Sequence, residues 1–324
     1  MPPFRILSLD GGGIRGVLTC VLLERLEAAR PGWLSKVDLF AGTSTGGILA
    51  LGLAAGISPT QARKLYEENG RRVFADSLLD DLKDLGNTVG AEYANAGLRD
   101  VLTAEFGNQT LGDLPKKILI SSFDLDNAPA DPQTLRTWKP KFFHNFPGAG
   151  SDAAERVVDV ALRTSAAPTF FPLVQGYIDG GVAANNPSMC ALAQALDEET
   201  GGQKLSDLVL LSVGTGSVSQ FLTAQDADWG WVQWARPIIE IMLTGNEGVA
   251  DYQSSRLLGK RYHRLDILLP DNIPLDAVSR VPELVALAER ADLSATTQWL
   301  TRAFKDAPAR PSPQAGGRRG RRVR

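Results

Sequence analysis

The stretch Gly42-Thr43-Ser44-Thr45-Gly46 has the residue pattern of a serine nucleophile on a sharp turn. The mostly apolar run 37–41 precedes it and the apolar segment 48–55 follows it, so a strand leads into Ser44 and a helix leads out. Glycines on both sides suit such a turn because side chains there would clash. Ser44 is therefore the candidate nucleophile, although a plain strand-to-helix turn has the same pattern.

A serine nucleophile also needs donors that stabilise the oxyanion formed during attack. Gly11, Gly12 and Gly13 lie between the strand-like run 4–9 and a helical pattern. Bare backbone N–H groups at such a junction can turn toward one point beside Ser44. We expect these three glycines to form an oxyanion hole; a helix-entry loop that needs positive φ is the alternative.

The base that activates the serine is the harder assignment. His144 and His263 are the only histidines; the first lies in an aromatic run and the second beside a probable strand. For a lone histidine, a surface or core position is commoner than a catalytic one. Asp179 is the better candidate because it ends a strand before Gly180-Gly181, on the same carboxyl edge as Ser44. Burial could raise its pKa and let it act as base, whereas an Asp-Gly-Gly turn is the structural alternative.

The pattern of apolar residues predicts the elements that position these groups. The first fifty residues indicate a right-handed β-α-β unit with strands at 4–9 and 37–41 and a helix that ends before Arg30. Strands alternate with helices along the chain, which indicates an α/β protein with a mostly parallel sheet covered on both faces. Further strands are expected at 117–123, 135–138 with 142–143, 208–213 and 264–269, and helices at 58–70, 78–85, 98–106, 151–162, 186–199, 282–291 and 293–304.

Composition and charge exclude several classes of protein. With 34 basic and 37 acidic residues in 324, the net charge is −3, so no nucleic-acid partner is expected. The longest apolar run, 48–57, is too short to span a bilayer, and the first twenty residues contain no export signal. Cys20 and Cys190 read as small buried thiols in a reducing compartment. We expect a soluble cytoplasmic protein without a metal or cofactor site.

Three motifs together resemble the patatin-like phospholipase family. They are a glycine-rich loop at residues 10–16, the G-x-S-x-G serine at 42–46 and the later D-G-G at 179–181, in the family's order. The segments 110–114, 165–172 and 212–216 are also similar to that family. The resemblance covers residues 4–216 and fades beyond them.

This resemblance implies a patatin-like three-layer α/β/α fold and hydrolysis of acyl esters on lipids such as phospholipids, without a cofactor. It implies a Ser44/Asp179 dyad that needs no histidine, and an oxyanion loop at Gly11, Gly12 and Gly13. Arg15 matches the family's basic position, where it could anchor the loop or contact a phosphate. We expect one hydrolase domain over 1–306 and a disordered Arg-rich tail over 307–324.

Other classes of function fit the residues less well. Gly11, Gly13 and Gly16 satisfy the G-x-G-x-x-G pattern of a dinucleotide-binding module, but Asp38 begins the second strand, whereas the ribose-binding acid should close it. Ser44, Asp179 and His263 follow the chain order of an α/β-hydrolase triad, but that nucleophile normally follows several strands. A catalytically dead lipid-binding or storage protein would carry the motifs without ester hydrolysis.

Residues 228–234 hold three of the six tryptophans, and the mostly apolar stretch 238–243 follows. Tryptophan favours the boundary between water and lipid, so this segment could dock on a membrane or cover an acyl pocket. Ordinary core packing is the commoner role for such a cluster. The Arg-rich tail offers a second contact with anionic lipid, so peripheral membrane association is a further expectation.

Overall fold

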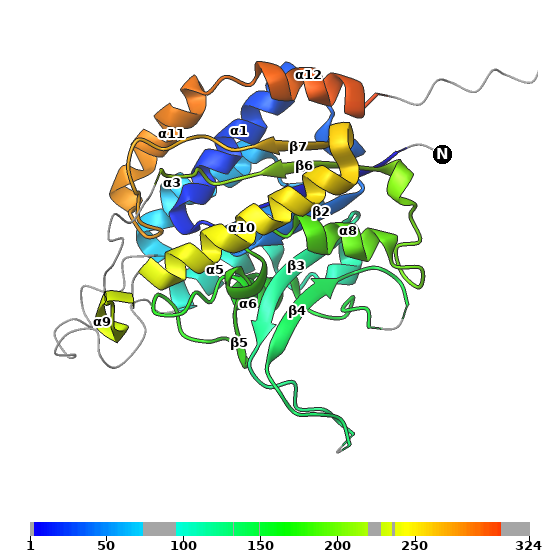
Figure 1. The fold of residues 1–324 in the computed structure, drawn as a ribbon, viewed down its shortest axis with the longest axis vertical. Helices are drawn as coiled ribbons and strands as arrows, with labels where there is room; N and C mark the ends of the chain where they lie inside the picture. The colour runs from blue at the N-terminus through cyan, green and yellow to red at the C-terminus, as the bar shows by residue number, and fades with distance from the viewer. Residues whose placement is uncertain are drawn as a thin grey trace, which may run out of the picture.

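The computed structural model describes residues 3–73, 95–131, 133–148, 150–219, 228–234 and 237–305. Within this part, a seven-stranded sheet runs through the centre of the molecule (Figure 1). The strand order is β4-β3-β2-β1-β6-β7, and β5 pairs with the end of β3. The strands are β1 (Phe4–Leu9), β2 (Leu39–Thr43), β3 (Lys117–Asp124), β4 (Lys139–His144), β5 (Tyr177–Asp179), β6 (Leu208–Val213) and β7 (Tyr262–Leu265).

The strands β3, β2, β1, β6 and β7 are parallel neighbours, whereas β4 and β5 are antiparallel to β3. The register places Leu9 beside Gly42 on one side and beside Val213 on the other, and Thr43 beside Ser121. The ends of the parallel strands therefore meet at one edge of the sheet, which we call the carboxyl edge.

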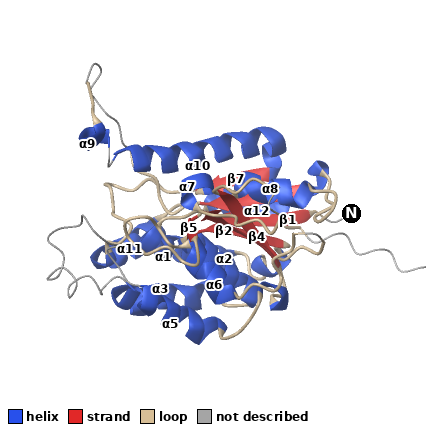
Figure 2. Cartoon of the chain, turned by 90° about the horizontal axis from the view of Figure 1, so that it is seen from below, coloured by secondary structure: helices blue, strands red, loops and turns tan. Residues whose placement is uncertain are grey.

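Helices cover both faces of the sheet and complete three layers (Figure 2). Two of the helices, α7 (Gly181–Ala184) and α9 (Trp231–Trp234), have only four residues each. On one face are α8 (Ser188–Leu196) and α10 (Pro237–Leu258). The other helices are α1 (Gly16–Ala29), α2 (Thr45–Ala55), α3 (Pro59–Val73), α5 (Asn95–Phe106), α6 (Val157–Thr164), α11 (Val281–Arg290) and α12 (Ser294–Ala303).

Alternation along the strands explains why both faces need a helical cover. On β1, Ile6 packs into the cluster beneath α8, whereas Leu7 and Leu9 pack into the larger cluster on the opposite face. Successive side chains of a strand point to opposite faces, and here both sets are buried. The three-layer α/β fold with a mostly parallel sheet is thus confirmed.

Several predicted boundaries are confirmed and several are wrong. The strands at 4–9 and 208–213 have the predicted bounds, and the helices predicted at 282–291 and 293–304 are α11 and α12. The last strand is shorter than predicted because the Asp266 carboxylate accepts the N–H groups of Gly216 and Ile267 and bends the chain after Leu265. The helix predicted at 78–85 lies outside the described residues, as do 306–324, so the domain limits and the disordered tail stay predictions.

The helix predicted at 151–162 begins only at Val157. The preceding residues instead pair with the segment before β3: Leu111 N–H donates to Glu155 O at 2.8 Å and Gly112 N–H to Ala153 O at 2.8 Å. Those carbonyl groups are therefore unavailable to a helix.

The strand predicted at 135–138 is a loop, because these residues lie beyond the end of β3. Leu135 is 76% exposed and Trp138 is 70% exposed there. They belong to the hairpin that projects below the sheet in Figure 1.

The 22-residue helix α10 is the main element that the sequence did not predict. It runs back across the sheet from the carboxyl edge, because its last residues lead through a turn to the start of β7. No helix in the described ranges combines the length and the apolar character needed to cross a bilayer.

Candidate active site

Ser44 lies at the junction of β2 and α2 in a strained backbone conformation, with φ 54° and ψ −125°. A Cβ atom at Gly42 would lie 2.2 Å from the Gly46 carbonyl oxygen, and one at Gly46 would lie 2.4 Å from that of Leu9. Only glycines fit these two positions, so the sharp turn predicted from the sequence is present. Ser44 is half-buried, and its N–H donates to Thr164 Oγ1 at 2.9 Å.

Asp179 ends β5 beside Ser122 and is 6% exposed. Its carboxylate accepts a hydrogen bond from the Gly181 N–H at 2.7 Å, and the Ser44 side chain lies close enough to stabilise the charged form. Burial raises the pKa of Asp179 to about 6, although these two contacts favour the charged form. A carboxylate in contact with the serine hydroxyl is placed to accept its proton.

Neither histidine is near Ser44. His263 lies on β7, three strands from β2, which is about 14 Å at the usual strand spacing. Its Nε2 is 2.9 Å from Thr296 Oγ1 and its ring stacks on Trp299. His144 lies on β4, two strands or about 10 Å away.

The glycine loop lies against the serine, since a Cβ atom at Gly11 would be 3.3 Å from Ser44 Cβ. Gly11 N–H donates to Asn185 O at 3.1 Å, and Gly11 O accepts from Thr215 Oγ1 at 2.9 Å. The Gly11 N–H is therefore not free to bind an oxyanion, whereas the sequence predicted that all three glycines would donate. Within the described ranges, the N–H groups of Gly12 and Gly13 have no acceptor, and Gly13 has φ +56°.

A cluster of charged side chains lies behind the loop. Arg264 Nη1 is 2.7 Å from the buried Asp10 carboxylate and Nη2 is 3.2 Å from that of Asp266. The Arg15 side chain makes neither a hydrogen bond nor an ion pair with any described residue, and burial lowers its pKa, while the nearby Glu247 carboxylate opposes this shift. Only the backbone of Arg15 contacts the loop, because its N–H donates to Gly12 O at 3.1 Å. No side-chain contact thus supports the expected anchoring of the loop by Arg15.

Sequence reasoning missed several residues that hold the site together. Thr164 follows the helix predicted at 151–162, and its hydroxyl accepts the Ser44 N–H and donates to Ser121 O at 2.6 Å. Asn185 lies just before the helix predicted at 186–199, where the sequence predicts no role for it. The signal available was its place, six residues after Asp179 and beside a second asparagine and a proline.

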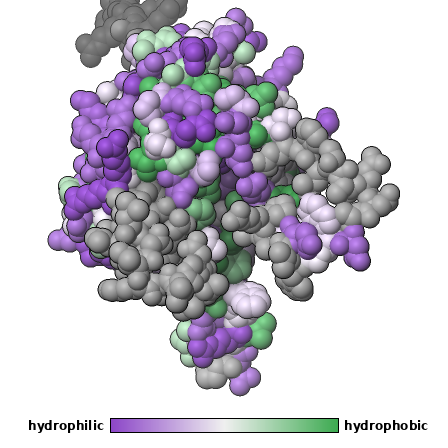
Figure 3. Space-filling view, turned by 90° about the vertical axis from the view of Figure 1, so that its left-hand side faces the viewer, coloured by the Kyte–Doolittle hydropathy of each residue, from purple (hydrophilic) through white to green (hydrophobic). Residues whose placement is uncertain are grey.

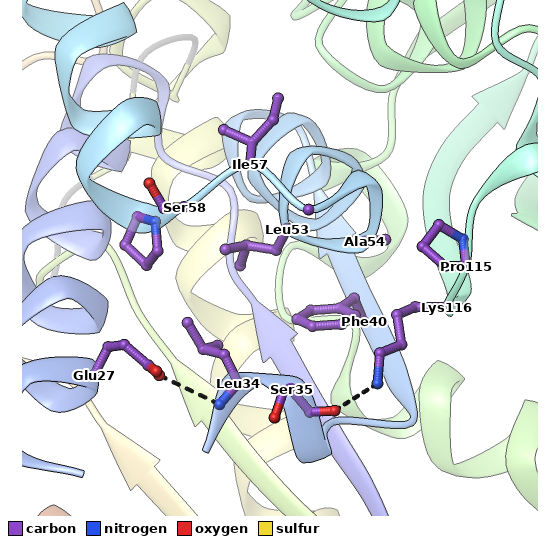
Figure 4. Close-up of a pocket in the computed structure, with 12 residues that line it drawn as sticks. Glu27, Leu34, Ser35, Phe40, Leu53, Ala54, Ile57, Ser58, Pro115 and Lys116 are labelled. Atoms are coloured by element: carbon purple, nitrogen blue, oxygen red, sulfur yellow. Dashed lines mark hydrogen bonds between the residues drawn. The ribbon is translucent and has the colours of Figure 1, made fainter. Parts of the chain in front are cut away.

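A separate apolar pocket of about 310 Å³ lies at the opposite edge of the sheet (Figure 4). It is lined by the turn before β2, by Phe40 of β2 and by the end of α2. Its charged groups are already bonded: Lys116 Nζ donates to Ser35 O at 2.7 Å and Glu27 accepts the Leu34 N–H at 3.4 Å. Its position excludes it from the chemistry at Ser44. In the described ranges, no group of three histidine, cysteine or acidic side chains is arranged to hold a metal ion.

Comparison with known proteins gives three findings. Residues 7–192 match the family model described as patatin-like phospholipase, a span that includes the glycine loop, Ser44 and Asp179. A cGAMP-activated phospholipase of Pseudomonas aeruginosa is 33% identical, over 82% of this chain and 79% of that protein, and patatin-like protein 1 of Oryza sativa is 28% identical, over 88% and 80%. The crystal structure of VipD from Legionella pneumophila aligns with a TM-score of 0.41 and 13% identity, over 88% of this chain and 67% of VipD.

Proposed function

Because the chain belongs to the patatin-like phospholipase family, we propose that it hydrolyses carboxylic esters of lipids, with Ser44 as nucleophile and Asp179 as base. The contact between the buried Asp179 carboxylate and the Ser44 side chain carries this proposal. The position of both histidines supports a dyad rather than a triad.

The reaction proceeds in two halves. Ser44 Oγ attacks the ester carbonyl carbon while its proton passes to Asp179, and the oxyanion accepts hydrogen bonds from the N–H groups of Gly12 and Gly13. The intermediate collapses to an acyl-enzyme, and the leaving alcohol takes the proton from Asp179. Asp179 then takes a proton from water as that water attacks the acyl carbon, and returns it to Ser44 as the carboxylic acid leaves.

The pKa of Asp179, about 6, suits this role. At neutral pH most of the carboxylate is charged and ready to accept a proton, yet it is more basic than an ordinary exposed aspartate. Burial supplies this basicity without a histidine.

We further propose that the substrate is taken from a lipid surface at the carboxyl edge. Large apolar side chains are exposed beyond the strand ends there: Leu135, Trp138, Leu173, Ile238, Ile241, Met242 and Leu268. Figure 3 looks onto this side of the molecule and shows apolar atoms near its centre and on the projecting hairpin. Peripheral contact of this edge with a membrane would bring the substrate to Ser44, and Arg15 would be available to a lipid phosphate.

The test is hydrolysis of p-nitrophenyl esters and phospholipids by the purified protein. Ser44→Ala and Asp179→Asn should each lower the rate of hydrolysis at least about 10³-fold, while the melting curve still shows a folded protein. His144→Ala and His263→Ala should keep most of it, because neither ring is within reach of Ser44.

Loss of activity in a folded His263→Ala variant would contradict the proposed dyad and favour a triad that includes His263. A wild-type protein that binds phospholipid vesicles but hydrolyses none of the esters would instead be a lipid-binding protein that kept the motifs.

A further inference from the structure

The side-chain amide of Asn246, on α10, bridges the two ends of α7. Its Oδ1 accepts the Asn185 N–H at 2.8 Å, and its Nδ2 donates to Gly181 O at 3.1 Å. The segment between these contacts is the one that leads from Asp179 to Asn185. One side chain of α10 therefore fixes both ends of the turn that follows the proposed base.

Glu247, the next residue of α10, holds the same turn through a second contact. Its carboxylate accepts a hydrogen bond from the Asn185 side-chain amide, and it is largely withdrawn from solvent. The Asn185 carbonyl in turn accepts the Gly11 N–H at 3.1 Å. A continuous chain of hydrogen bonds thus runs from α10 through Asn185 to the glycine loop.

Close packing leaves Asn185 little freedom between the two halves of the site. A Cβ atom at Gly11 would lie 2.2 Å from Asn185 Oδ1, and one at Gly181 would lie 3.0 Å from the same atom. Because Gly181 also donates its N–H to Asp179, a shift of Asn185 must disturb the loop, the turn or both.

We propose that Asn246 and Glu247 are positioning residues that hold the glycine loop and Asp179 at a fixed distance from each other. This inference rests on the proposed function, since it assigns the loop and Asp179 to one reaction. The two α10 residues act through Asn185 and Gly181, not through contact with the substrate. The transition state needs the base and the oxyanion donors at the same moment, so their relative position matters more for kcat than for KM.

The Gly181 N–H gives this role a measurable signature. It stabilises the charged form of Asp179, and in the described ranges the other influences on that pKa are burial and the Ser44 hydroxyl, with no charged side chain among them. Loss of the Asn246 contact to Gly181 should weaken this hydrogen bond and move the acid limb of the pH profile to higher pH.

The first variant is Asn246→Ala, assayed with a soluble p-nitrophenyl ester. We expect kcat to fall about 10-fold to 100-fold, with KM within about 3-fold of the wild type and the acid limb at higher pH. Gln253→Ala is the matched control, because Gln253 is an exposed amide on the same helix and makes no contact with α7. Melting curves of both variants separate misfolding from mispositioning.

The second pair of variants is Glu247→Ala and Glu247→Gln. Alanine leaves the Asn185 amide without its acceptor, whereas glutamine keeps an oxygen there and should recover most of the kcat lost in alanine. The glutamine change also removes a charge that interacts with Asp10, Arg15, Arg264 and Asp266, so its pH profile is compared with that of Asn246→Ala.

The possible results separate the two proposals. A wild-type protein that neither hydrolyses esters nor reacts with a fluorophosphonate at Ser44 contradicts the proposed function. An active wild type with folded Asn246→Ala and Glu247→Ala variants of unchanged kcat and unchanged acid limb contradicts the positioning role alone. If Asn246→Ala does not fold, the comparison of Glu247→Ala with Glu247→Gln decides it: equal kcat in this pair contradicts the inference.

Discussion

Asp179 is subject to two opposing influences. Burial favours its neutral form, while the Ser44 hydroxyl and the Gly181 N–H favour the carboxylate, and burial dominates. A buried aspartate of this kind can do the work that a histidine does in Ser-His-Asp hydrolases.

The pH dependence of the reaction follows from this balance. With Asp179 as the proposed base, activity needs its charged form, so kcat/KM should fall as the pH falls through about 6 and reach a plateau above about 7. The profile is measured from pH 5 to 8 with a soluble ester.

Histidine is the control for this prediction because it also titrates near pH 6. Burial lowers the pKa of His263 below its usual 6.5, so its titration has to be separated from that of Asp179. The limb should persist in His263→Ala and in His144→Ala. Its disappearance in either variant would assign the titration to that histidine.

At this scale the sequence predicted Ser44 and Asp179 as the candidate pair because short glycine motifs mark both positions. It could not show that the Asn185 carbonyl accepts the Gly11 N–H, since that depends on where α7 places this carbonyl group. Nor could it show the contacts of Thr164 and Glu247, which join elements far apart in the chain. Motifs report local backbone needs, whereas these contacts arise from packing.

Among the elements, the glycine loop is held from both sides. Thr215 packs so closely that a Cβ atom at Gly12 would lie 2.1 Å from its Oγ1, and a Cβ atom at Gly13 would lie 2.2 Å from Leu275 O. The loop is thus confined between the segments after β6 and β7, and a side chain at either glycine must displace it.

Gly12→Ala should therefore lower kcat about 10²-fold with a smaller change in KM, since displaced N–H groups no longer meet the oxyanion. A second change that makes room for the new methyl group should restore part of the lost kcat. The double variant Gly12→Ala/Thr215→Gly is compared with Thr215→Gly alone, in which the contact is absent. Unchanged kcat in a folded Gly12→Ala protein would make the loop purely structural.

Element boundaries show where local patterns fail. The strands β1 and β6 were predicted to the residue because they are buried on both faces. The start of α6 was missed because residues 151–156 bond to a distant segment. The helix α10 was missed because its contact face mixes polar residues such as Asn246 and Glu247 with a few apolar ones. Such contacts leave no apolar periodicity in the sequence.

In the whole molecule, the order of the strands gathers the site at one edge. The three-layer fold was predictable because alternating strands and helices permit few arrangements. The character of the surface was not. Core packing was the commoner expectation for 238–243, yet Ile238, Ile241 and Met242 are exposed. The ring centroids of Trp229 and Trp234 are 5.1 Å apart, so these two rings contact each other. The side chain of Trp231 lies outside the described part.

These exposed side chains lead to a prediction about membrane binding. Trp138, 70% exposed, and Met242, 57% exposed, lie beyond the carboxyl edge on separate elements, whereas Leu205, also exposed, precedes β6 at the opposite edge. If the carboxyl edge meets the lipid, Trp138→Ser and Met242→Ser should each weaken binding to phospholipid vesicles about 5-fold, the effect of roughly 1 kcal/mol of apolar burial. Leu205→Ser should bind as the wild type does.

Vesicle sedimentation measures the binding, and two assays separate it from chemistry. Hydrolysis of a soluble ester should stay unchanged in all three variants because none of these residues contacts Ser44 or Asp179, while hydrolysis of vesicle phospholipid should fall in Trp138→Ser and Met242→Ser alone. Equal binding in all three variants would mean that lipid reaches Ser44 without docking of this edge. An equal loss in Leu205→Ser would show that general surface hydrophobicity, and not the carboxyl edge, holds the protein on the vesicle.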